Sequence, residues 1–184
     1  MKRIRYIAIY GVLIIGLMGC KKEVADPDSY NPNVLPPLTH EGKNTFGCLV
    51  NGEVWVAYAP FTVGGAVAIT GEFNLGEGYI RATTKSDEKH QIIGMFFKNI
   101  SGVGEYYFYL NSETKLGIMY LDDKSPSDCS SIYYHDLNNT GVLNISYLNQ
   151  NERIMSGTFE MDLVNPSCPG DTVKIREGRF DWRY

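Results

Sequence analysis

The stretch "RIMSGTFEMDLV", residues 153–164, decides the fold because its apolar and polar side chains alternate with a period of two. Successive side chains of a β-strand point to opposite faces, so this alternation predicts a strand with one buried and one solvated face. The stretch "GVLNISYLN", residues 141–149, has the same alternation. No long window beyond residue 45 shows the repeat of a helix, so the sequence predicts an all-β domain. The alternating apolar residues are Met155, Phe159, Met161 and Leu163 in the first stretch and Leu143, Ile145 and Tyr147 in the second.

Short runs rich in glycine, asparagine and aspartate separate the strand-like segments and indicate tight turns. We expect nine to eleven short antiparallel strands, joined mostly as a meander and arranged as a sandwich or a flattened barrel. Two segments have bulky residues at both odd and even positions: "QIIGMFFKNI" at 91–100 and "EYYFYL" at 105–110. This pattern indicates strands that are covered on two sides or lie at an interface. The turn signals are Asn51-Gly52, Gly64-Gly65 and residues 74–78, 101–104, 122–128, 138–141 and 149–152.

The last strand changes its parity. Val173 and Ile175 put the apolar face on odd positions, whereas Phe180 and Trp182 put it on even positions. A change of parity within one strand needs an extra residue, and glycine tolerates the positive φ of one common bulge type. We therefore predict a β-bulge at Glu177-Gly178. The alternative is that the strand ends near this point and restarts.

The N-terminus has the layout of a signal peptide. Residues 1–5 carry three positive charges, and residues 6–19 are uncharged and mostly apolar. This run is shorter than the roughly 20 apolar residues that a spanning helix needs. Its end, Leu17-Met18-Gly19-Cys20, resembles the bacterial lipobox, in which the cysteine is lipidated and becomes the first residue of the mature protein. We therefore expect a signal peptide over residues 1–19 and lipidation at Cys20. The alternative is a core cysteine at the end of a hydrophobic helix.

Residues 20–44 form a segment with four of the eight prolines of the chain and almost no apolar periodicity. Proline favours extended backbone, so we predict a tether that holds a single β domain, residues 45–184, away from a bilayer. The alternative is that "NVLPPL", residues 33–38, packs back on the domain. Without the three cations of residues 1–5, the formal charge of −4 becomes −7. Because the chain is acidic and has no basic stripe, we do not expect it to bind nucleic acid. We expect it to be attached to a membrane through acyl chains.

Four segments carry a likeness to known sequences: "NTFGCLVNGEVWV" (44–56), "GVLNISYL" (141–148), "SGTFEM" (156–161) and "GRFDWRY" (178–184). With the lipobox and the proline-containing leader, they resemble a Bacteroidota lipoprotein family of unknown function. The likeness covers most of residues 36–184. It implies a β-rich, exported lipoprotein and supplies no catalytic or binding residues. We expect this protein to be located at the outer membrane. The side of the membrane stays open, because Lys22-Glu23 resembles a surface-display signal whereas Val24 stands where a second acid is expected.

Three cysteines remain after Cys20. Cys48 shares the apolar face of the first predicted strand, where a free thiol behaves as a small hydrophobe. Cys129 and Cys168 both lie in polar segments rich in turn residues, so we predict a Cys129–Cys168 disulfide. Three unpaired thiols are the alternative.

The sequence has no motif typical of an enzyme or a metal site. It lacks H-E-x-x-H, C-x-x-C, G-x-S-x-G and a phosphate-binding glycine loop. The carboxylates of Asp122, Asp123 and Asp128 match no calcium loop and indicate a solvated turn. We therefore expect a protein that is not an enzyme, with no cofactor and no bound metal.

Aromatic side chains are the remaining candidates for function. Tyr106, Tyr107, Phe108 and Tyr109 are consecutive, so alternate rings must face opposite sides of the sheet and some are expected to be exposed. Exposed rings can stack on apolar sugar faces or on a protein partner. We interpret the chain as a non-catalytic binding or accessory module for a glycan or an envelope protein. The predicted binding residues are Tyr106, Tyr107, Tyr109 and, with burial as an equal alternative, Trp55. A structural envelope component, with the rings filling the core, and a barrel-type carrier of an apolar molecule are the alternative functions.

Overall fold

A computed structural model describes residues 31, 33–59, 68–85, 90–108, 117–124, 128–135 and 141–184. Residues 31–184 form one compact unit, and only this unit is described below. The predicted signal peptide and the predicted lipidation site, Cys20, lie outside the described residues.

The described residues form eleven β-strands and no helix, which confirms the predicted all-β fold. Every pairing between named strands is antiparallel. The strands are β1 (Thr45–Val50), β2 (Glu53–Val56), β3 (Ile69–Asn74), β4 (Glu77–Lys85), β5 (His90–Phe97), β6 (Gly104–Phe108), β7 (Gly117–Asp122), β8 (Ile132–His135), β9 (Gly141–Asn149), β10 (Ile154–Val164) and β11 (Thr172–Arg183).

All strands belong to one curled sheet with the order β2-β1-β11-β10-β8-β7-β5-β4-β3. Most neighbours are consecutive hairpins, as expected for a meander. Four pairings depart from it: β1 lies beside β11, β5 beside β7, β8 beside β10, and β6 beside β9. The long strand β10 makes the curl possible, because one of its edges pairs with β9 in its first half and with β8 at its end.

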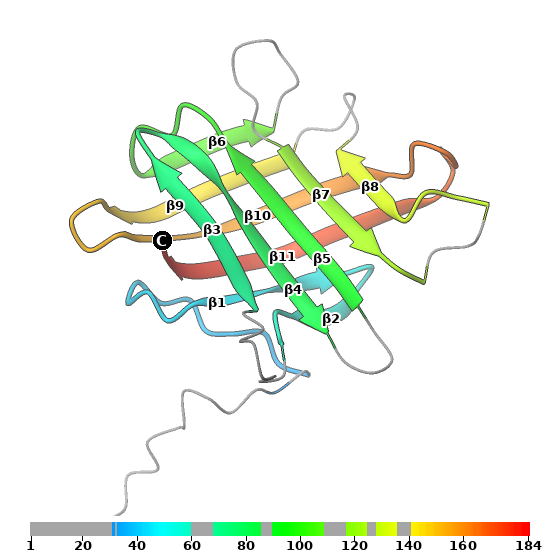
Figure 1. Cartoon of the computed structure of the whole chain (residues 1–184), viewed down its shortest axis with the longest axis horizontal. Coiled ribbons are helices and arrows are strands. Elements are labelled where there is room, and N and C mark those ends of the chain that lie inside the picture. The colour runs from blue at the N-terminus through cyan, green and yellow to red at the C-terminus, as the bar shows by residue number, and fades with distance from the viewer. Residues whose placement is uncertain are drawn as a thin grey trace, which may run out of the picture. The chain divides into compact units, whose positions relative to one another are not determined.

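The curled sheet folds into two layers. In Figure 1, β3, β4, β5 and β7 cross in front of β9, β10 and β11. We call β3, β4, β5, β7 and β8 the front layer and β1, β2, β6, β9, β10 and β11 the rear layer. The inward side chains of both layers form one core. In this core, the Phe46 ring lies 5.1 Å from Phe159 and 6.4 Å from Phe180, and Phe73 of the front layer lies 5.3 Å from Tyr184.

The predicted bulge is present in β11. The register shifts by one residue against β1 between Arg179 and Arg176 and against β10 between Gly178 and Ile175. The buried positions therefore change from Val173 and Ile175 to Phe180 and Trp182. The positive φ falls on Glu177 (50°) and not on Gly178. Glycine is required at 178 for space, because a Cβ there would lie 2.5 Å from the carbonyl oxygen of Phe159.

The end of the predicted tether is bound to the domain. The buried carboxylate of Asp181 on β11 accepts hydrogen bonds from the hydroxyl of Thr39 (2.5 Å) and from the N–H groups of Glu41 (3.1 Å), Gly42 (2.8 Å) and Lys43 (3.2 Å). Gly42 has a φ of 69°, which glycine adopts without strain. The domain therefore begins earlier than residue 45. We call residues 36–44 the strap.

The strap crosses the outer face of the rear layer. Pro36 lies against Gly47, where an added Cβ would approach the proline Cδ to 2.6 Å. Further along, the His40 ring stacks on Tyr147 with a centroid distance of 5.3 Å. These contacts agree with the alternative that the proline-containing segment packs back on the domain.

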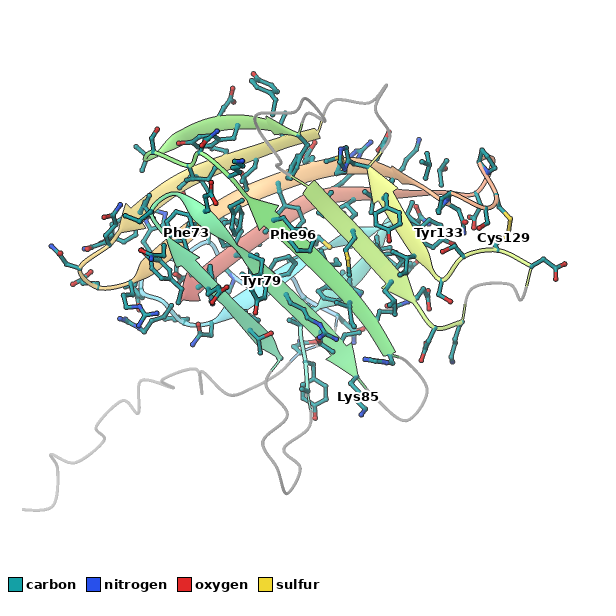
Figure 2. The ribbon with its side chains drawn as sticks, turned by 45° about the horizontal axis from the view of Figure 1, so that its top comes forward. Phe73, Tyr79, Lys85, Phe96, Cys129 and Tyr133 are labelled. Atoms are coloured by element: carbon teal, nitrogen blue, oxygen red, sulfur yellow. A yellow bond between two sulfur atoms is a disulfide. The ribbon has the colours of Figure 1, made fainter. Side chains whose placement is uncertain are left out.

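The predicted disulfide between Cys129 and Cys168 is formed, with the two Cα atoms 5.6 Å apart. It joins the β7–β8 connection to the β10–β11 connection, and Figure 2 shows it beside the labelled Cys129. Buried Asn165 reinforces this link, because its Nδ2 donates to the carbonyl of Ser130 and its Oδ1 accepts from the N–H of Ser130. Cys48 is free and buried, as predicted.

Candidate functional site

The predicted run of rings on β6 divides between the two faces of the sheet. Phe108 is buried in the core, and Tyr106 is partly buried against it. The Tyr106 hydroxyl is engaged within its own loop, since it donates to the carbonyl of Gly102 (2.8 Å). Tyr107 is 49% exposed, and its hydroxyl donates to Glu105. Tyr109 lies outside the described residues, so β6 contributes one described ring that is exposed.

Trp55 is a core residue, and the structure corrects its place among the predicted binding rings. It is 2% exposed and packs edge-on against Phe46 at a centroid distance of 6.0 Å. Its cross-strand partner is Cys48, which is buried as well. A ring enclosed in this way cannot stack on an external ligand.

The outer face of the front layer carries exposed rings that the sequence did not single out. Tyr79 on β4 is 39% exposed, and Phe96 on β5 is 47% exposed. The two residues are direct cross-strand partners, and their rings lie 6.5 Å apart with an interplanar angle of 35°. Figure 2 shows both labelled side chains on these adjacent strands. Both rings point outward, because the flanking residues Ile80 and Met95 are fully buried in the core.

These rings line an open groove with a volume of about 690 Å³, which we call the aromatic groove. Glycine provides part of its space. Gly117 is the partner of Phe96 on β7, and a Cβ at Gly117 would lie 3.9 Å from the Phe96 ring. The absence of a side chain at 117 therefore leaves one side of the Phe96 ring open.

Polar side chains surround the apolar floor. Glu72 is the cross-strand partner of Tyr79, and Asn74 pairs with Glu77 at the next outward position. Lys98, just after β5, also lines the groove. Within the described part of the chain, none of these four side chains makes a hydrogen bond or an ion pair, so their polar atoms are free for a ligand. With two carboxylates and one ammonium group, this rim carries a small negative charge.

The outer face of the rear layer differs in character. Arg176 and Asp162 form an ion pair of 2.5 Å across β11 and β10, and Lys174 is exposed beside them. The strap covers another part of this face at Asp181. Only the front layer therefore combines paired exposed rings with a groove among the described residues.

The acidic side chain of Asp122 is engaged in hydrogen bonds within the fold. Asp122, part of the acidic turn, accepts hydrogen bonds from the side chains of Gln91 (2.7 Å) and Tyr120 (3.1 Å) and from the N–H of Lys124. Burial, with the nearby carboxylate of Asp122, raises the pKa of the Tyr120 hydroxyl, and burial raises the pKa of the Cys48 thiol. In the described ranges, no three His, Cys, Asp or Glu side chains are placed to hold a metal ion. The arrangement favours binding through rings and hydrogen bonds.

A sequence signal for the groove existed. The segment at 91–100 is bulky at both parities, and the structure shows its two faces: Ile93, Met95 and Phe97 face the core, whereas Phe96 faces outward. The sequence pattern could not predict that Tyr79 lies beside Phe96, because this pairing depends on the register between β4 and β5.

The described residues contain no helix that is long and apolar enough to cross a bilayer. Among known proteins, no family model, no curated protein and no solved structure matches this chain.

Proposed function

We propose that this protein is a lipid-anchored cell-envelope protein whose β domain is a non-catalytic binding module acting through the aromatic groove. The observation that carries the proposal is the cross-strand pair Tyr79 and Phe96, with both rings exposed on the floor of a groove of about 690 Å³. Concave sites with an apolar floor and a few polar groups are typical of ligand-binding proteins. Single exposed rings are common on protein surfaces, but a side-by-side pair in a groove is a better candidate for a binding site.

The place of the strap supports this role. Residues 36–44 lie on the outer face of the rear layer, where Pro36 contacts Gly47 and Gly42 binds Asp181. The aromatic groove lies on the outer face of the other layer. A chain anchored at Cys20 would therefore join the domain on the face opposite the groove, which leaves the groove open to a ligand.

The packed core argues against the carrier of an apolar molecule. The inward rings of the rear layer, Phe46, Trp55, Phe159 and Phe180, contact one another, and Phe73 of the front layer packs edge-on against Tyr184. A carrier needs this same space for its cargo. A structural role without a ligand would use the paired rings only for their modest cross-strand contact, whereas exposed apolar surface of this kind is typical of interaction sites.

Binding measurements on the full chain in detergent test the proposal. The protein is immobilised and exposed to a panel of glycans and envelope proteins, and wild type is compared with Tyr79→Ala and Phe96→Ala. The matched control is Val103→Ala, because Val103 is an exposed apolar residue between β5 and β6 that does not line the groove. We expect a binding partner whose affinity falls in the two groove variants and is retained in the control. A panel without any binder, or binding that all variants retain, would favour the structural role.

A further inference from the structure

We propose that the ligand of the aromatic groove is a neutral saccharide built of pyranose rings with equatorial hydroxyl groups. This inference rests on the proposed function. It is argued from the floor of the groove, from its rim, and from the area that the groove offers.

The floor matches the apolar face of a sugar. An equatorially substituted pyranose presents flat faces of C–H groups, which pack on aromatic rings. Phe96 and Tyr79 lie on adjacent strands with centroids 6.5 Å apart and planes inclined by 35°. The two rings thus form one shallow platform on which consecutive sugar rings can lie. Gly117, the cross-strand neighbour of Phe96, carries no side chain that could lie beside this ring.

The rim matches the edge of a sugar. Each carboxylate of Glu72 and Glu77 can accept hydrogen bonds from two neighbouring hydroxyl groups, whereas the ammonium group of Lys98 can donate to hydroxyl oxygens. Asn74 can do both. These groups are not engaged with other described side chains, so a saccharide could use them without breaking existing bonds.

The charge of the rim selects among ligands. A purely apolar ligand would take water from the carboxylates of Glu72 and Glu77 and give no hydrogen bonds in return, which is costly. An acidic saccharide would be repelled by the same two carboxylates. A neutral, hydroxyl-rich ligand can donate hydrogen bonds to the two carboxylates and is not repelled by their charge.

The area of exposed rings is small for a protein partner. Tyr79 and Phe96 are 39 and 47% exposed. Because each such side chain has about 200 Å² of surface, the two rings offer roughly 170 Å² together. A stable protein interface takes about 800 Å² from each partner. The groove volume of about 690 Å³, in contrast, falls within the range of about 300–1,000 Å³ that is usual for small-ligand sites.

The test is a direct titration of the full chain in detergent with soluble hexasaccharides. The neutral probes are β-1,4-linked hexaoses of glucose, xylose and N-acetylglucosamine, and the β-1,4-linked hexamer of glucuronic acid is the acidic probe of the same stereochemistry. We expect saturable binding of at least one neutral hexaose, little change of its affinity with salt, and weaker binding of the glucuronic acid hexamer. Tyr79→Ala and Phe96→Ala should each weaken binding about tenfold or more, as truncated aromatic anchors do, whereas Val103→Ala, outside the groove, should not. Glu72→Gln, which alters no packing, should weaken binding as well and gives a second readout if a ring variant misfolds.

Two results would overturn the inference. One is that none of the neutral hexaoses binds at millimolar concentration, and the other is that binding survives the loss of both rings. If an envelope protein then binds wild type and loses affinity in the ring variants, the groove is a protein-binding site and the proposed function stands without the saccharide. If neither class of partner depends on the rings, both proposals fail.

Discussion

Asp181 on the last strand accepts a 2.8 Å hydrogen bond from the N–H of Gly42, which precedes it by 139 residues. The same carboxylate accepts a 2.8 Å hydrogen bond from the hydroxyl of Ser156 on the neighbouring strand. Asp181 is 1% exposed, so these bonds are shielded from water. One side chain thereby fastens the strap to the two central strands of the rear layer.

Replacing Asp181 by asparagine should lower the free energy of unfolding by about 2–3 kcal/mol, because charge-assisted hydrogen bonds are lost and an NH₂ group meets backbone donors. Urea denaturation measures the change. The control is Asp162→Asn, whose ion pair with Arg176 is partly exposed and should cost less than about 1 kcal/mol. Equal effects of the two changes would contradict the importance assigned to Asp181.

The same group predicts how stability depends on pH. Burial raises the pKa of Asp181, but hydrogen bonds from two hydroxyl groups and from backbone N–H groups outweigh burial and hold the pKa below its usual range. The folded state therefore binds fewer protons at this site than the unfolded state. Its contribution is complete above about pH 4, the ordinary value for aspartate, and is lost as the pH falls through the lower folded value. Unfolding curves measured from pH 6 downward should show a loss of stability in wild type that is smaller in Asp181→Asn.

Removing the disulfide should destabilise the domain. The link joins positions 39 residues apart, and closing a loop of this length is worth about 4 kcal/mol in the chain-entropy estimate. The double variant Cys129→Ser/Cys168→Ser should unfold at lower urea concentration by an amount that corresponds to most of this value. Added reductant should destabilise wild type and leave the double variant unchanged.

Alkylation should reach Cys48 only after unfolding, because its side chain is fully buried.

Core and groove rings should respond differently to truncation. Trp55→Ala opens a cavity beside Phe46 and should cost about 3–5 kcal/mol. Tyr79→Ala removes an exposed cross-strand partner of Phe96 and should cost about 1 kcal/mol or less. Thermal or urea unfolding of the two variants checks the contrast. A Tyr79 variant as unstable as the Trp55 variant would mean that the groove rings are structural.

Lipidation at Cys20 stays a prediction of the sequence, since this residue lies outside the described part of the chain. Intact mass of the membrane-bound protein should show the loss of residues 1–19 and a gain in mass from acyl chains. Cys20→Ala should leave an unprocessed or released protein. Wild-type protein that is found at the membrane with residues 1–19 still attached would refute the assignment.

The amino-acid sequence alone determined the features that depend on local pattern. The period of two in residues 153–164 predicts β10, because side chains of a strand alternate whatever the strand pairs with. The parity change before Phe180 predicts the bulge for the same reason. The pairing of Cys129 with Cys168 followed from the turn-rich composition around both residues, which places them in connections at the surface.

The tertiary structure alone decided which edges meet and which faces stay open. Alternation assigns Tyr106 and Tyr107 to opposite faces, but only the pairing of β6 with β9 puts Tyr106 against the core. In the same way, Phe96 points outward by parity, whereas its exposure beside Tyr79 requires the register of β4 and β5 and a face that no described strand covers. The strap is bound through Asp181, a residue that the local pattern places on a solvated face. Local sequence sets the direction of each side chain, but burial depends on segments that are distant in sequence, and no local period encodes their position.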